Sequence, residues 1–129
     1  MQTSNPPGTP TPIGPYSHLV TFPSTSTQIQ ISGTAGVDKD GRLAGPDVYS
    51  QARQILALFK LMLESANSGL HLITHVNIFL LNMADFPEMN RAYAEALGAH
   101  RPARTTIGVA ALPKPGAVVT MNATALTEP

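Results

Sequence analysis

An apolar stretch at residues 72–82 most narrowly limits what this chain can fold into. Seven of its residues are aliphatic or aromatic: Leu72, Ile73, Val76, Ile78, Phe79, Leu80 and Leu81. A short run of this kind, rich in β-branched and aromatic residues, is typical of a buried strand. We therefore predict a central strand from about 74 to 82, which needs neighbouring strands and a covering layer.

The segment before this strand has the pattern of an amphipathic helix over about 48–66. Its apolar residues recur at helical spacing and form one face: Ala52, Ile55, Leu56, Phe59, Leu63 and Ala66. Asp47 is placed to accept hydrogen bonds from free amides of the first turn. Asn67 or Gly69 can end the helix in a left-handed conformation.

A second helix is predicted after the strand. Asp85 and Glu88 have the spacing of a capping box, and Pro87 falls in the first turn, where proline is tolerated. This helix is expected to continue to about Leu97 and to end at Gly98.

Strands are predicted at 18–22, 28–33, 104–110 and 117–126, with a possible short extra strand near 35–37. Within 28–33, isoleucines alternate with polar residues, which is the period of a half-buried strand. The order β-β-α-β-α-β-β predicts an α/β (α+β) fold in which one sheet carries two helices on one face. We expect residues 1–11 to be a flexible lead-in and residues 12–129 to form a single domain.

Composition agrees with one domain and excludes several kinds of protein. The 129 residues are 43% hydrophobic, which is enough for one core but leaves two cores too small. A net charge of zero gives no basic surface to attract nucleic acid. Only 12% of residues are charged, which indicates that part of the surface is buried against other subunits.

The chain contains no cysteine, which excludes disulfides, a thiolate zinc site and a cysteine nucleophile. This composition is compatible with a reducing compartment, and we expect a cytoplasmic protein. No run of 18 apolar residues could span a membrane. The four histidines lack the spacing of metal ligands, so we expect no metal site.

Arg104 is the first candidate for chemistry. It begins a predicted strand, and its guanidinium has paired donors that suit a carboxylate or phosphate. The alternative is a surface arginine in a salt bridge. Tyr16 follows a loop stiffened by Pro12 and Pro15, which could hold its phenol over a pocket. The alternative there is an ordinary turn with a packed tyrosine.

Two further places carry candidate residues. Ser32 and Gly33 end a predicted strand, where a glycine lets a ligand approach a free backbone amide. A β-bulge would also explain that glycine. Asn90 and Tyr93 lie three residues apart and share one face of the second helix, although surface polarity would explain both.

The chain resembles the RidA (YjgF/YER057c/UK114) family over about residues 11–126. The resemblance is carried by segments in the family's order and spacing: Pro12–Ser17, Ile31–Gly33, Gln51–Gln54, Asp85–Phe86 with Asn90 and Tyr93, Pro102–Thr105, and Leu112–Pro113. It implies a chorismate-mutase-like fold with a six-stranded mixed sheet and two helices on one face. It also implies a homotrimer with clefts between subunits, and hydrolysis of reactive imines or enamines without a metal or organic cofactor.

The resemblance also assigns roles to particular residues. Arg104 would hold the substrate carboxylate with help from the backbone of Gly33 and Thr106. Tyr16 would line the site from the facing subunit, and Asn90 matches an asparagine near the cleft. We expect Ser32, which precedes Gly33, to contribute to the same contact.

The last strand departs from the family pattern. Asn122 stands where a water-positioning glutamate is expected, and Thr120 replaces the acidic residue before it. An amide is a far poorer base than a carboxylate, and general-base help is worth roughly 10²–10⁴-fold. The family's Ser-Gly-Gln also becomes Ser32-Gly33-Thr34, and Leu58 replaces an asparagine.

The leading hypothesis is an enzyme that hydrolyses a small carboxylate-bearing imine or enamine to a keto acid and ammonia. Arg104 would hold the carboxylate, while Asn122 and Tyr16 would orient the water or the leaving nitrogen. One alternative is a family member specific to one pathway, acting on an aminomuconate-like or biosynthetic intermediate. Another is a binding module that takes a small carboxylate without turnover. A ribonuclease is disfavoured by the missing basic surface.

Overall fold

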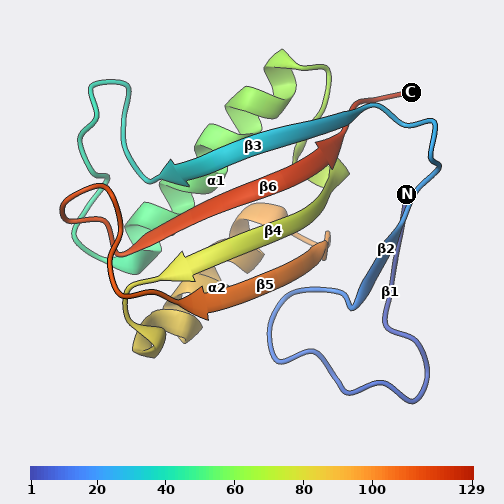
Figure 1. Ribbon diagram of the computed structural model, residues 1–129, viewed down its shortest axis with the longest axis horizontal. Helices are drawn as coiled ribbons and strands as arrows, with labels where there is room; N and C mark the ends of the chain where they lie inside the picture. Colours follow the sequence, from blue (N-terminus) through green and yellow to red (C-terminus); the bar gives the residue numbers. More distant parts are fainter.

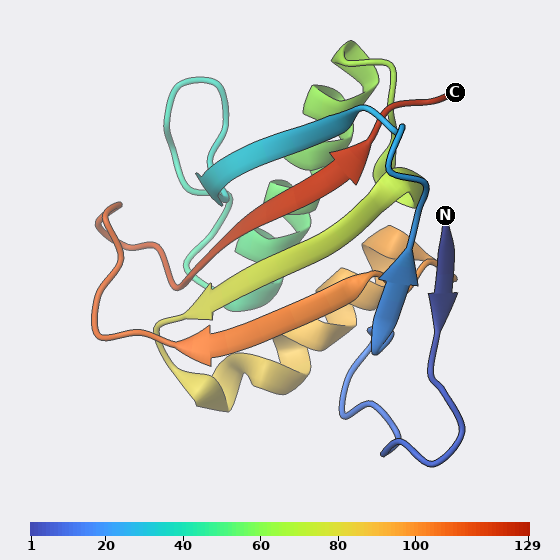
Figure 2. The ribbon, with the colours of Figure 1, turned by 45° about the vertical axis from the view of Figure 1, so that its right-hand side comes forward.

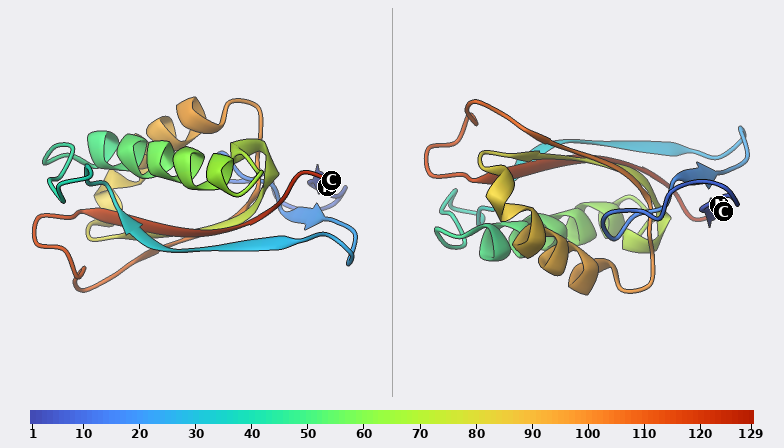
Figure 3. Two further views of the ribbon diagram at one scale, coloured as in Figure 1. Left: turned by 90° about the horizontal axis from the view of Figure 1, so that it is seen from above. Right: turned by 90° about the horizontal axis from the view of Figure 1, so that it is seen from below.

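The computed structural model describes residues 1–129 and contains two layers (Figure 1). One layer is a four-stranded sheet made of β3 (Gln28–Ala35), β4 (Ile73–Leu80), β5 (Ala103–Gly108) and β6 (Val119–Leu126). The other consists of α1 (Val48–Ser65) and α2 (Phe86–Leu97). The predicted fold class is confirmed: the sheet is mixed and both helices cover the same face (Figure 3).

The six strands lie in two sheets instead of the single sheet that we expected. In the larger sheet the order is β3-β6-β4-β5, with β4 parallel to β5 and antiparallel to β6. The short strands β1 (Gln2–Ser4) and β2 (Leu19–Thr21) pair only with each other, beside the main sheet (Figure 2). A turn at Pro23, whose carbonyl accepts from Ser26 N at 3.1 Å, separates β2 from β3.

The N-terminal residues include one of these strands. We expected a flexible lead-in over 1–11, and within that range Gln2–Ser4 pair antiparallel with β2. Of the extra strand expected near 35–37, only Ala35 lies in a strand, as the last residue of β3, which continues past a bulge between Ile31 and Thr34. Beyond it, Val37 forms a single bridge with Leu43.

The core lies between the helices and the sheet. Val76, Ile78 and Leu80 of β4 are completely buried beneath the helices, together with Phe59 of α1 and Tyr93 of α2. The alternate residues of β4, His75, Asn77 and Phe79, face the other side and are only half-buried. No helix covers that side of the sheet (Figure 3), which we call the open face.

The predicted cap of α1 is confirmed, but that of α2 is wrong. Asp47 accepts from Ser50 N at 2.9 Å, and Asn67 takes the left-handed conformation beyond the helix, with φ of 57°. Asp85 instead has helical backbone angles and makes no capping bond, while the Glu88 carboxylate binds Arg91 at 2.9 Å. The short turn η2 (Met83–Asp85) precedes α2, so Asp85 lacks the extended conformation that a cap requires.

None of the helices is long and apolar enough to cross a membrane.

Candidate active site

Arg104 lies on β5 and points to the side of the sheet that carries the helices. Residues paired in register on neighbouring strands share a face, and Arg104 pairs with Val76 while Thr106 pairs with Ile78. Val76 and Ile78 are both buried under the helices. Arg104 and Thr106 therefore point towards α2.

The Arg104 guanidinium is surrounded by aromatic rings and has no anionic partner. Its Cζ lies 5.0 Å from the ring centre of Tyr93, 5.2 Å from that of Tyr16 and 5.6 Å from that of Phe86. Rings at these distances favour a cation. Nη1 is buried without a hydrogen-bond partner, and none of the chain's ion pairs includes Arg104.

Partial burial affects the pKa of the Arg104 guanidinium. Desolvation lowers the pKa of Arg104 below its ordinary value, because a charge loses hydration there. The nearby phenols of Tyr93 and Tyr16 offset only part of that effect. A buried guanidinium without a counter-charge is costly, so the site is suited to an anionic ligand.

The loop from Pro12 to Tyr16 covers one side of the guanidinium. Tyr16 N donates to Gly14 O at 2.8 Å, and Ile13 N donates to the Tyr16 hydroxyl at 3.3 Å, so the loop turns tightly on itself. A Cβ on Gly14 would lie 2.5 Å from Arg104 Nη2 and 3.3 Å from both amide atoms of Asn90. Only glycine lets the backbone approach these two side chains so closely.

Four buried polar atoms in this region have no hydrogen-bond partner. They are Asn90 Oδ1, the Tyr93 hydroxyl, Arg104 Nη1 and Thr106 Oγ1. Buried polar groups are normally paired, so a group of orphaned atoms around one arginine indicates a ligand or water site. Burial also raises the pKa of the Tyr93 phenol, which keeps its proton at neutral pH.

A cavity of about 170 Å³ opens beside Arg104. It is lined by Ile13, Tyr16, Phe86, Arg104 and Thr106. Its walls are therefore an aliphatic side chain, two aromatic rings, one cation and one hydroxyl. This combination suits a small anion with a short apolar substituent.

The structure brings together some of the predicted site residues and separates others. Tyr16, Asn90 and Thr106 lie around Arg104 of the same chain, whereas the resemblance placed Tyr16 on a facing subunit. Ser32 and Gly33 are on β3, at the opposite edge of the sheet from β5. Within one chain they cannot contact the Arg104 ligand.

Asn122 is also separate from Arg104. It pairs in register with Asn77 on β6 and β4, and its Oδ1 accepts from Asn77 Nδ2 at 2.9 Å. Asn77 belongs to the open face, so Asn122 is on the opposite side of the sheet from the Arg104 cavity. The strand period of two explains the separation, because alternate residues point to opposite faces.

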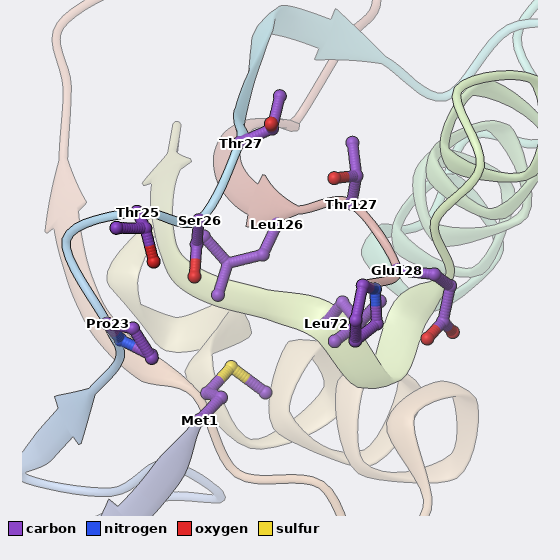
Figure 4. Close-up of a pocket in the computed structure, with 10 residues that line it drawn as sticks. Met1, Pro23, Thr25, Ser26, Thr27, Leu72, Leu126, Thr127 and Glu128 are labelled. Atoms are coloured by element: carbon purple, nitrogen blue, oxygen red, sulfur yellow. The ribbon is translucent and has the colours of Figure 1, made fainter.

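A larger cavity, of about 460 Å³, lies elsewhere and contains none of the predicted site residues (Figure 4). It is bordered by both chain ends and by the hydroxyl residues Thr25, Ser26, Thr27 and Thr127. The one carboxylate side chain in its lining, Glu128, already binds His71 Nε2 at 2.8 Å. We therefore place the chemistry at Arg104, where unpaired polar atoms gather.

Sequence reasoning missed three contributors to the site: Phe86, Tyr93 as a polar group, and Gly14 as a contact of Arg104. The shared helix face of Asn90 and Tyr93 was a usable signal. No local pattern indicates that this face meets β5, because the contact depends on how α2 packs on the sheet.

Together, the fold and the site define a small mixed α and β domain with a candidate site for a small anion beside a half-buried arginine. Residues 7–127 match the family described as endoribonuclease L-PSP. The chain belongs to this family, which is the YjgF/RidA family.

Relatives with named activities are similar along most of their length. A 2-iminobutanoate/2-iminopropanoate deaminase of Dermatophagoides farinae is 36% identical over 81% of this chain and 80% of its own. The 3-aminoacrylate deaminase RutC of Acinetobacter baylyi is 34% identical over 88% of each chain. Among solved structures, the Rid-family protein YyfB of Yersinia pestis has a TM-score of 0.86 with 26% identity, covering 97% of each chain.

Proposed function

We propose that this protein hydrolyses a small carboxylate-bearing imine or enamine to a keto acid and ammonia, with the carboxylate held by Arg104. The observation that carries the proposal is the half-buried Arg104 guanidinium, which has three aromatic neighbours and no anionic partner in its own chain. The relatives named as imine and aminoacrylate deaminases support the same class of reaction.

The reaction needs only water as a second reactant. The water oxygen bonds to the imine carbon, and both water protons pass to the nitrogen. The C–N bond then breaks with its electron pair on nitrogen, which leaves as ammonia, and the carbon becomes a ketone. An enamine follows the same route once a proton has moved from its nitrogen to its terminal carbon.

Arg104 contributes binding and electrostatics in this scheme. Two parallel N–H donors can fix a carboxylate in one orientation, which also fixes the adjacent imine carbon. Held in place, that carbon is presented to water without the entropy loss of a random encounter. The Tyr16 and Phe86 rings would border the short side chain of the substrate.

We further propose that a second copy of the chain completes the site in a homotrimer. Ser32, Gly33 and Asn122 cannot reach the Arg104 ligand of their own chain, so a role for them requires another subunit. The open face of the sheet and two exposed apolar residues near β5, Met83 and Ile107, offer surface for such contacts. Light scattering should give three times the chain mass, and an Ile107→Glu variant should dissociate.

The activity is tested with imines generated in the assay, because these compounds hydrolyse spontaneously and cannot be stored. Semicarbazide traps the imine that the protein has not hydrolysed, so semicarbazone formation is the readout. The 2-imino acids of three and four carbons are formed in situ, and the protein competes with semicarbazide for them. Wild type should lower semicarbazone formation and Arg104→Ala should not. Arg42→Ala is the matched control, since Arg42 is an exposed arginine outside the site. No competition by wild type would refute the proposed activity.

Two further variants test the altered last strand. Asn122→Glu and Thr120→Glu each restore a carboxylate to the open face beside β4. If wild type does not compete with semicarbazide but one of these variants does, the fold and the carboxylate site are right and the natural substrate differs, as in a pathway-specific relative. Saturable binding of keto acids without any turnover would instead favour a binding module.

The family description also names an endoribonuclease. A net charge of zero gives few contacts for a phosphate backbone, and we do not propose this activity. RNA should therefore remain intact after incubation with the protein at concentrations that deaminate imines.

A further inference from the structure

Two side chains of α2 have buried polar atoms without hydrogen-bond partners, and carboxylate binding by Arg104 does not explain them. Asn90 Oδ1 and the Tyr93 hydroxyl are buried and unpaired. Neither group is needed to neutralise the guanidinium, and neither stabilises the fold through a hydrogen bond of its own. Phenylalanine would fill the volume of Tyr93 without leaving a hydroxyl unpaired.

We propose that Asn90 and Tyr93 bind the nitrogen of the substrate, so that the site selects carboxylates with an N–H group on the adjacent carbon. This inference rests on the proposed function and extends it from the carboxylate to the group that leaves. It also makes Tyr93 a substrate-contacting residue, in addition to its place in the core.

Both side chains lie against Arg104, on the side nearest α2. The Tyr93 ring centre is 5.0 Å from Arg104 Cζ, and that is the shortest of the three ring contacts of the guanidinium. The Asn90 amide and Arg104 Nη2 both lie close to the position that a Cβ on Gly14 would occupy. Asn90 and Tyr93 lie beyond the residues that line the cavity, so the proposal is that a carboxylate on Arg104 directs the substituent on its neighbouring carbon towards α2 and these two groups.

The hydrogen-bonding types decide what that substituent must be. An amide oxygen only accepts hydrogen bonds, so Asn90 Oδ1 needs a donor. An iminium or amino nitrogen donates, whereas the ketone oxygen of the product only accepts. A hydroxyl can donate or accept, so Tyr93 adapts to either. Asn90 would therefore hold the nitrogen-bearing substrate more firmly than the keto acid, which favours product release.

A matched pair of stable ligands tests whether the site selects an N–H donor on the carbon that bears the carboxylate. Pyrrole-2-carboxylate has an N–H next to the carbon that bears its carboxylate, and 2-furoate has an ether oxygen at the same position. The two rings have nearly the same shape and the same charge. Titration calorimetry with the full chain should show that wild type binds the pyrrole about tenfold more tightly, as expected for one hydrogen bond.

Three variants complete the experiment. Asn90→Leu should bring the ratio of the two dissociation constants close to one, mainly by weakening the pyrrole. Tyr93→Phe should weaken both ligands, because its hydroxyl can donate to one and accept from the other. Tyr49→Phe is the matched control, because the Tyr49 hydroxyl binds Glu95 on the helix surface, and it should keep the wild-type ratio. Tyr93→Phe should also unfold at the wild-type temperature or above, because it loses a hydroxyl that has no partner.

The outcomes separate this inference from the proposed function. Equal affinity for pyrrole and furoate, lost in Arg104→Ala, would overturn the role of Asn90 and Tyr93 and leave the carboxylate site standing. Failure of both ligands to bind would overturn both proposals. If Tyr93→Phe lowered the melting temperature and left both dissociation constants unchanged, the hydroxyl would be structural and the inference would be wrong.

Discussion

At the scale of single residues, the site is built from contacts that strand register and one glycine make possible. Arg104 and Thr106 share a face of β5, and α2 supplies Asn90 and Tyr93 opposite them. Gly14 closes the arrangement from the N-terminal loop. The result is a guanidinium fixed between aromatic rings, with its hydrogen-bonding capacity unused.

Gly14→Ala should weaken carboxylate binding by about tenfold or more, which corresponds to about 1.4 kcal/mol. The new Cβ would start 2.5 Å from Arg104 Nη2, so the guanidinium has to move. The Gly14 backbone is not in the left-handed region, so alanine is compatible with its conformation. Calorimetry with 2-oxobutanoate measures the loss, and an unchanged dissociation constant would show that Gly14 does not position Arg104.

The sequence indicated several of these residues and misjudged how others meet. Arg104, Tyr16, Asn90 and Thr106 were candidates and lie together. Asn122 was grouped with them because it aligns with a functional position in the family. Its side of the sheet follows from the pairing of β6 with β4, which is a tertiary property that a linear motif does not contain.

At the scale of elements, α1 is joined to two loops by one buried side chain. Gln51 is completely buried, and its Nε2 donates to Gly45 O at 2.8 Å and to Gly116 O at 3.1 Å. Its Oε1 accepts from Val118 N at 2.9 Å. Gln51 therefore ties the start of β6 and the loop before α1 to the helix.

Gln51→Leu should lower the free energy of unfolding by about 2–4 kcal/mol, because backbone groups lose their partners at roughly 1–3 kcal/mol for each buried one. Gln54→Leu is the matched control. Gln54 makes a single bond, from Nε2 to Val37 O at 2.9 Å, and its loss should cost about 1 kcal/mol. Urea denaturation compares the two, and equal losses would contradict the anchoring role of Gln51.

The helices and central strands could be predicted because their patterns are local. The cap at Asp47 and the left-handed Asn67 were both visible in the sequence. The capping box at Asp85 was not formed, since the preceding turn already sets that residue in a helical conformation. The separation of β1 and β2 from the main sheet depends on which strands pair with each other. Strand propensity is a local property and does not determine strand pairing.

At the scale of the whole molecule, the sheet is covered on one face only. The helices bury the central strands on their face, whereas the open face has half-buried polar and aromatic residues such as Asn77, Phe79 and Asn122. The proposed trimer would cover this face with a second copy of the chain. In that proposal, Gly33 or Asn122 of a neighbouring subunit would complete the Arg104 site.

Stability should fall as the pH drops from 7.5 to 5.5. Burial lowers the pKa of His100 below its ordinary 6.5, and burial also lowers the pKa of His75. Below 6.5 the unfolded chain binds more protons than the folded one, so the stabilising contribution is complete above 6.5 and is lost on acidification. Urea unfolding at the two pH values measures this, with His100→Gln expected to reduce the difference. Greater stability at pH 5.5 would contradict it.

Carboxylate binding by the unpaired Arg104 guanidinium underlies the proposed function. Its most direct test is titration calorimetry of 2-oxobutanoate against its uncharged amide, using wild type, Arg104→Ala and Arg42→Ala. The acid should bind wild type and Arg42→Ala alike, and either the amide or Arg104→Ala should weaken binding by at least about tenfold. If Arg104→Ala bound the acid as tightly as wild type, the carboxylate site would lie elsewhere and Arg104 would not be its binding residue.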